Sequence, residues 1–99
     1  MNRIFTYEDA AALLPVVQRL TSETIAALDE VGDDANSAEY QRLVSAWAES
    51  LIGMGLEVKG LWLVDFDNGS GYYCWSHPEP SLQYFHGYEE GFRGRVKLQ

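Results

Sequence analysis

The sequence predicts an α+β protein in which an N-terminal antiparallel helical hairpin packs on a C-terminal three-stranded antiparallel sheet. Apolar residues recur every three or four positions as far as about residue 55. From Leu56 the spacing changes to two, and glycine and aromatic residues become more frequent. Asn68-Gly69, a pair that suits a type I′ hairpin turn, stands within this second part. We therefore interpret residues 1–99 as a single domain, with a helical hairpin at 1–55 and a β-meander with a glycine- and arginine-containing tail at 56–99.

The first predicted helix begins after Thr6, which has Asp9 three positions later in a variant of the capping box. Its apolar stripe consists of Ala10, Leu13, Val17, Leu20, Thr24, Leu28 and Val31. Pro15 lies inside this stretch and removes one helix hydrogen bond, so we expect a kink or a break there. A polar turn is predicted at 32–37.

The second helix is expected to begin at Asn36 or Ser37, with Glu39 as the capping partner of Asn36, and to end near Gly55. Its expected buried face consists of Tyr40, Leu43, Val44, Trp47, Leu51 and Met54. Because the connection between the helices is short, they should pack as antiparallel neighbours.

Three strands are predicted in the second part, at residues 61–66, 72–76 and 82–86. A two-residue turn at Asn68-Gly69 would place Asp65 opposite Tyr72. The next connection contains two prolines, which exclude continued pairing. A turn centred on Glu79 would then place Tyr72 opposite His86.

This register sorts the side chains of the sheet onto two faces. One face would carry a row of Asp65, Tyr72 and His86, with Leu63, Cys74 and Tyr84 beneath it. The other face is more apolar and is expected to contact the helices; it would carry Trp62, Val64, Tyr73, Trp75 and Phe85. A slip of one residue in either turn would exchange the two faces of a whole strand.

Composition excludes several classes of partner. The formal charge is −8 and no basic stripe is present, so we expect no nucleic acid and no anionic membrane surface as partner. Cys74 is the only cysteine, which rules out an intrachain disulfide and fits a reducing compartment. The N-terminal residues do not resemble a signal peptide, and no apolar run is long enough to span a bilayer. We therefore expect a cytoplasmic protein.

Motifs near both ends of the chain resemble one family. FTYEDAAALLP stands at 5–15, VDF at 64–66, CW at 74–75 and FHGYEEGFRGR at 85–95, with Glu79 in between. This pattern resembles an uncharacterised, largely bacterial family, the domain of unknown function 2203. The family usually has a longer helical middle, and a glycine where this chain has Trp62. The matching positions are Asp65, Phe66, Cys74, Trp75, Glu79, His86, Gly91, Phe92, Gly94 and Arg95. The resemblance implies no activity.

His86 and Asp65 are the candidate catalytic residues. A histidine can exchange a proton or bind a metal near neutral pH, and an aspartate in the same row could orient its ring. A histidine at a strand end can equally serve only to hydrogen-bond to backbone.

Arg95 has two interpretations. It could form a bidentate pair with Asp65 or Glu79 that fastens the C-terminal segment to the sheet. Alternatively, it could bind a small anionic ligand in a pocket with His86, walled by Tyr72 or Tyr84.

Metal binding is not indicated by the spacing of residues along the chain. The available ligands are Asp65, Cys74, His77, Glu79 and His86, and they match no recognised zinc or iron pattern. We therefore expect no metal and no cofactor, and interpret Cys74 as a small buried residue.

Two functional hypotheses follow. The favoured one is a non-enzymatic association module acting as a homodimer. Dimerisation would cover an edge strand and an aromatic-rich surface that one small chain leaves exposed to water. The alternative is a small-ligand-binding or metal-dependent enzyme with a pocket around His86, Asp65 and Arg95. The two differ in whether these three residues converge on an accessible cavity.

Overall fold

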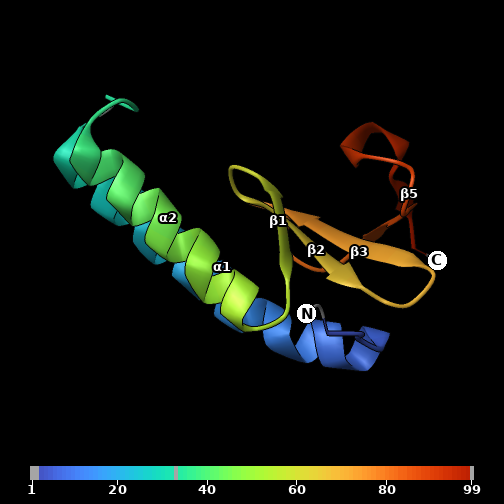
Figure 1. Ribbon diagram of the computed structural model, residues 1–99. Helices are drawn as coiled ribbons and strands as arrows, with labels where there is room; N and C mark the ends of the chain where they lie inside the picture. Colours follow the sequence, from blue (N-terminus) through green and yellow to red (C-terminus); the bar gives the residue numbers. More distant parts are fainter. Residues whose placement is uncertain (1–2, 33, 99) are drawn as a thin grey trace.

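The computed structural model describes residues 3–32 and 34–98, which form two helices followed by a five-stranded antiparallel sheet (Figure 1). The elements are α1 (Tyr7–Val31), α2 (Ala38–Gly53), β1 (Glu57–Gly60), β2 (Leu63–Asp67), β3 (Gly71–Ser76), β4 (Tyr84–Gly87), the 3₁₀ turn η1 (Phe92–Gly94) and β5 (Val96–Lys97). The α+β class and the helical hairpin are confirmed. The predicted count of three strands is wrong, because β1 and β5 add an edge strand on either side. No helix in this described part of the chain is long and apolar enough to cross a membrane.

α1 begins where its capping pattern predicts. The hydroxyl of Thr6 accepts a hydrogen bond from the backbone N–H of Asp9 at 3.1 Å. The helix continues through Pro15 to Val31, so of the two predicted alternatives, a kink or a break, the break does not occur. Figure 1 shows α1 bending beyond its first turns. Packing of α1 against the core on both sides of Pro15 offsets the loss of one backbone hydrogen bond, which costs about 3 kcal/mol.

α2 is capped by Ser37 rather than Asn36. The Ser37 hydroxyl accepts a hydrogen bond from the backbone N–H of Tyr40 at 3.0 Å. The helix ends at Gly53, and Gly55 then turns the chain into β1 with a φ of 90°. A Cβ atom at Gly55 would lie 2.6 Å from the Cβ of Arg3, so both the turn and the close approach require glycine.

The register of the first hairpin differs from the prediction by two residues. Asp67 pairs with Tyr72, and Asp65 pairs with Cys74. The turn is longer than two residues because Oδ1 of Asn68 accepts hydrogen bonds from the backbone N–H groups of Ser70 and Gly71, both at 2.9 Å. A shift of two leaves every side chain on its predicted face. In the second hairpin, the pairs Tyr72–His86 and Cys74–Tyr84 are as predicted.

The helices cover one face of the sheet, and this face carries the apolar side chains. Val64, Phe66 and Trp75 are buried against the helices. The rest of the core comes from Phe5, Ala10, Leu14, Val17, Trp47, Leu51, Leu56 and Leu82. Trp62 lies outside β2, in the turn before it, with a φ of 62° that favours glycine. Its ring packs on Trp47 with 4.8 Å between ring centroids.

The C-terminal segment covers part of the opposite face. The hydroxyl of Tyr88 donates to Oδ1 of Asp67 at 2.6 Å, and its ring packs on Tyr72. β5 pairs with β4, and the guanidinium of Arg95 reaches back over the sheet toward Cys74. A polar layer is thereby enclosed between the sheet and this segment.

Candidate functional site

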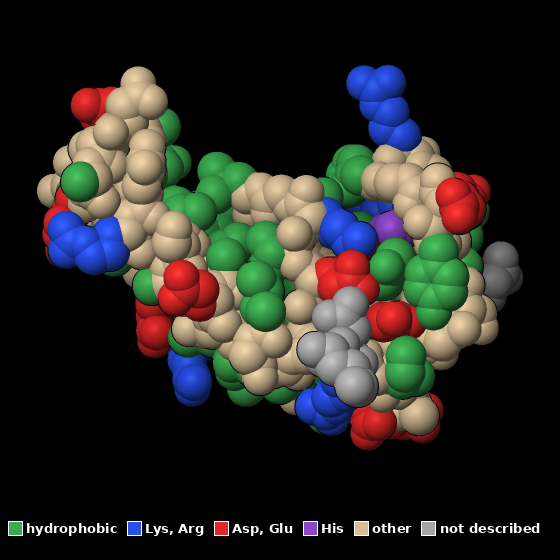
Figure 2. Space-filling model, viewed as in Figure 1, with side chains coloured by type: hydrophobic (Ala, Val, Ile, Leu, Met, Phe, Trp, Pro, Cys, Tyr) green, Lys and Arg blue, Asp and Glu red, His purple; other side chains and the backbone are tan. Residues whose placement is uncertain are grey.

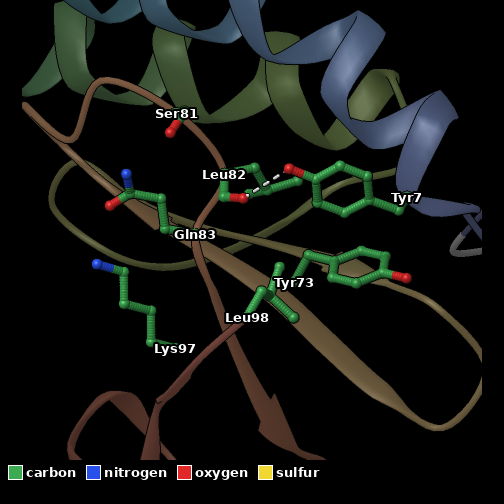
Figure 3. Close-up of a pocket in the computed structure, with 7 residues that line it drawn as sticks. All are labelled: Tyr7, Tyr73, Ser81, Leu82, Gln83, Lys97 and Leu98. Carbon is green, nitrogen blue, oxygen red and sulfur yellow. Dashed lines mark hydrogen bonds between the residues drawn. The ribbon is translucent and has the colours of Figure 1, made fainter.

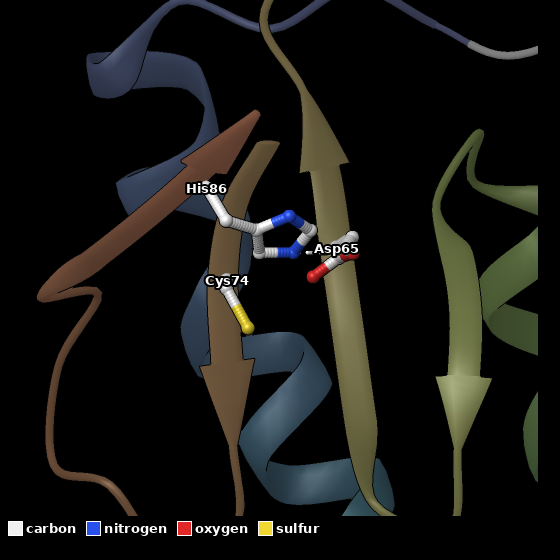
Figure 4. A group of neighbouring side chains, drawn as sticks. All are labelled: Asp65, Cys74 and His86. Atoms are coloured by element: carbon white, nitrogen blue, oxygen red, sulfur yellow. Dashed lines mark hydrogen bonds and ion pairs between the residues drawn. The ribbon is translucent and has the colours of Figure 1, made fainter. Parts of the chain in front are cut away.

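Asp65, Cys74 and His86 come from three adjacent strands and converge on the sheet face that points away from the helices (Figure 4). Asp65 in β2 lies directly opposite Cys74 in β3, and His86 in β4 reaches them diagonally. One donor atom from each residue lies within 4.8 Å of the other two. All three side chains are buried, with exposed fractions of 1%, 0% and 4%.

The ring of His86 is fixed by a partner at each nitrogen. Nδ1 lies 3.0 Å from the carbonyl oxygen of Gly87, and Nε2 lies 2.9 Å from Oδ2 of Asp65. Because a carbonyl only accepts hydrogen bonds, Nδ1 must carry a proton. A second proton therefore lies between Nε2 and the carboxyl group, and it is bonded either to His86 or to Asp65. The structure thus brings the two candidate catalytic residues into direct contact.

The carboxyl group of Asp65 is only half satisfied. Burial raises the pKa of Asp65, and the attraction of His86 and the nearby thiol of Cys74 oppose this shift. Oδ1 is buried and has no hydrogen-bond partner among the described residues. An unpaired buried carboxylate oxygen is costly, so this atom calls for an explanation.

Cys74 is a buried free thiol. Burial, together with the charge of Asp65, raises the pKa of the Cys74 thiol to about 12. The thiol is therefore neutral near pH 7 and has little nucleophilic character. This agrees with its interpretation as a small buried residue.

Arg95 pairs with Glu79, not with Asp65. Its Nη1 lies 3.0 Å from Oε1 of Glu79, and its Nη2 lies 2.9 Å from Oε2. The guanidinium also lies 4.0 Å from the ring centroids of both Tyr84 and Phe92. This bidentate, stacked arrangement fastens the C-terminal segment to the loop between β3 and β4.

Tyr72 and Tyr84 neighbour the buried group, by which we mean Asp65, Cys74 and His86: Tyr72 pairs with His86, and Tyr84 pairs with Cys74. The ring of Tyr72 lies 5.3 Å from that of His86, and its hydroxyl donates to Glu57 at 3.2 Å. Lys59 pairs with Glu57 at 2.9 Å and covers the Tyr72 ring. Glu57 and Lys59 were not predicted, because they lie in β1 and a strand of four residues gives little periodic signal.

Three pockets on the described part of the chain have none of Asp65, His86 and Arg95 in their linings, and one of the three is lined in part by Glu79. The largest has a volume of about 520 Å³, with Tyr7 donating from its hydroxyl to the carbonyl of Leu82 at one wall (Figure 3). Its lining consists of Tyr7, Tyr73, Ser81, Leu82, Gln83, Lys97 and Leu98. The anion-binding role of Arg95, with Tyr72, Tyr84 and Glu79, stays a prediction, and the pairing of Arg95 with Glu79 gives it no support.

Comparison with known proteins gives one match. The family model described as "Uncharacterized conserved protein (DUF2203)" matches residues 29–98. The match includes the second helix and all the strands but not the FTYEDAAALLP stretch. No curated protein and no solved structure matches the chain. The comparison supplies a lineage without an activity.

Proposed function

Since the chain belongs to the DUF2203 family of uncharacterized conserved proteins, which brings no activity with it, we propose its function from its own surface. The protein is a non-enzymatic association module that works as a homodimer. The observation that carries this proposal is the outer half of the helical hairpin, which has no sheet beneath it.

Element lengths explain why the hairpin projects. α1 has 25 residues and is about 37 Å long, whereas the longest strand has six residues and is about 20 Å long. Figure 1 shows the far end of the hairpin extending past the sheet. Ile25, Tyr40, Leu43 and Val44 lie in this outer half and are only half-buried. Two helices without a third layer leave such apolar side chains partly in water.

A hollow on the hairpin provides the matching surface. Figure 2 shows the molecule hollowed between the end of the hairpin and the C-terminal segment, with hydrophobic side chains along the floor. On the hairpin side, a pocket is lined by Ile25, Leu28, Asp29, Gly32, Tyr40 and Trp62; we call it the hairpin hollow. Leu61, next to Trp62 in the turn between β1 and β2, is 52% exposed. In a two-fold dimer, Leu61 of each copy would fill the hairpin hollow of the other.

Light scattering coupled to size-exclusion chromatography tests this proposal. We expect the unaltered chain to elute as a dimer, and Leu61→Glu to shift it to the monomer because a charge would enter an apolar contact. Ile52→Glu is the matched control. Ile52 is 57% exposed and lies near the C-terminal end of α2, whereas Tyr40, which lines the hairpin hollow, lies near the N-terminal end. A monomeric wild-type protein at every concentration would refute the dimer.

The enzymatic alternative has less support. It requires His86, Asp65 and Arg95 around an accessible cavity, but the first two are buried and the third is paired with Glu79. A buried group that a substrate cannot reach has no route to turnover.

A further inference from the structure

We propose that Asp65, Cys74 and His86 form a zinc-binding site in the sheet. This inference is independent of the proposed dimer, because it rests on a different face of the molecule. The prediction of no metal rested on spacing along the chain, and strand pairing brings together residues that such spacing does not connect.

The set of donors fits zinc. A carboxylate oxygen, a thiolate sulfur and an imidazole nitrogen are the three ligand types that Zn²⁺ uses in proteins. Cys74 is a neutral thiol in the absence of metal, so zinc binding would release its proton to solvent. Zinc bonds of about 2.0–2.3 Å in a tetrahedron separate the donors by roughly 3.5 Å. The donor atoms here lie within 4.8 Å of one another, so small side-chain movements would close the site. Three protein ligands leave one of the four positions for a water molecule.

The hydrogen bonding of His86 has the arrangement found for metal ligands. A ligating histidine usually donates its second ring N–H to a backbone carbonyl or a carboxylate, which fixes the tautomer. The Nδ1 of His86 donates to Gly87 in this way, so the lone pair of Nε2 is left facing Oδ2 of Asp65. Two acceptors that face each other need a cation between them, either a proton or a metal ion.

The unpaired oxygen of Asp65 is the second, independent observation. Oδ1 is buried without a partner among the described residues, whereas the polar atoms around it are engaged. A buried carboxylate oxygen that lacks a hydrogen-bond donor can instead be satisfied by coordinating a metal ion. Zinc would therefore remove the energetic cost of burying Oδ1 without a partner.

The surrounding charges tolerate a divalent ion. Arg95 lies beside the site, with Nη1 3.9 Å from Sγ of Cys74. Its charge is balanced by Glu79 through two contacts of 2.9 and 3.0 Å. Arg95 can donate to a metal-bound thiolate, as partners in the outer sphere of metal sites commonly do.

Titration of chelator-stripped, tag-free protein with Zn²⁺ against a chromophoric competitor tests the site. We expect one Zn²⁺ per chain. Cys74→Ser should weaken binding by about 100-fold or more, since loss of outer-sphere partners alone costs about 10–100-fold. His77→Gln is the matched control, because His77 offers the same donor but packs on Trp75 outside the group, and it should bind as the wild type does.

Cobalt supplies a readout that needs no variant. Co²⁺ bound by Cys74 should give the near-ultraviolet charge-transfer band of a cobalt–thiolate bond, together with the visible bands of a tetrahedral ion. This spectrum decides the question even if Cys74→Ser does not fold. Absence of stoichiometric Zn²⁺ binding, a cobalt spectrum without the thiolate band, or unchanged affinity in a folded Cys74→Ser protein would each overturn the proposal.

Discussion

Arg95 illustrates how one side chain can hold a segment that has almost no regular structure. Its guanidinium makes two contacts with Glu79 and is stacked between Tyr84 and Phe92, and its side chain is only 12% exposed. The sequence indicated a fastening role, with Asp65 and Glu79 as alternatives. It could not decide between them, because the choice depends on where the loop between β3 and β4 places Glu79.

Replacing Arg95 with lysine tests this role. Lysine keeps the charge but lacks the planar fork and the stacking surface, so we expect the free energy of unfolding to fall by about 1–3 kcal/mol. Urea denaturation monitored by tryptophan fluorescence measures the change. Arg93→Lys, at an exposed neighbouring position, is the control and should be close to neutral. Equal stability of Arg95→Lys and wild type would contradict the fastening role.

Cys74 should be unreactive while the protein is folded. Burial and a pKa of about 12 leave about one thiol in 10⁴ ionised at pH 8, and that thiolate is not accessible. We expect negligible alkylation by iodoacetamide at pH 8 with chelator present, and complete alkylation in urea. Mass spectrometry measures both. Rapid modification of the folded chain would show that the C-terminal segment opens readily.

At the level of elements, the sequence predicted what depends on local periodicity and missed what depends on pairing. The helices follow from spacing. The cap of the first follows from Thr6, and that of the second is Ser37, one of its two predicted starting residues. β1 and β5 were missed because four and two residues carry too little pattern. The same limit applies to the buried group, since Asp65 and Cys74 become opposite each other only through a turn whose length Asn68 sets by its side-chain contacts.

Trp62 provides a test of backbone strain in the turn before β2. Its φ of 62° favours glycine, while its ring packs on Trp47. Trp62→Ala loses the packing and keeps the strain, whereas Trp62→Gly loses the packing and relieves it. We expect both variants to be less stable than wild type, with glycine more stable than alanine by about 1 kcal/mol. Chemical denaturation of both variants measures the order, and a more stable alanine variant would show that the turn is not strained.

The whole molecule is elongated, with extents of 39 × 24 × 24 Å, because the hairpin is longer than the sheet. Its formal charge of −8 sets the conditions under which two copies can associate. Like charges repel over about 8–10 Å at physiological salt, and added salt screens this repulsion. An apolar contact between acidic copies should therefore be weakest at low ionic strength.

Salt and concentration should stabilise the proposed dimer together. We expect the melting temperature to rise with protein concentration over about a hundredfold range, because a dimer stabilises the folded state by mass action. The dimer dissociation constant should fall as sodium chloride is added. Differential scanning fluorimetry and analytical ultracentrifugation measure the two effects. Leu61→Glu should abolish the concentration dependence and Ile52→Glu should preserve it.

The order of strands in the sheet, β1-β2-β3-β4-β5, follows the order of the chain. Each ladder therefore closes only a short loop, and the entropy lost in closing each one is small. We expect the sheet to assemble rapidly, one hairpin after another. The contact of Phe5 with β2, through a 2.7 Å hydrogen bond to the carbonyl of Asp67 and packing on Phe66, spans most of the chain. The slowest step of folding should therefore be the docking of the N-terminal segment onto a sheet that has already formed.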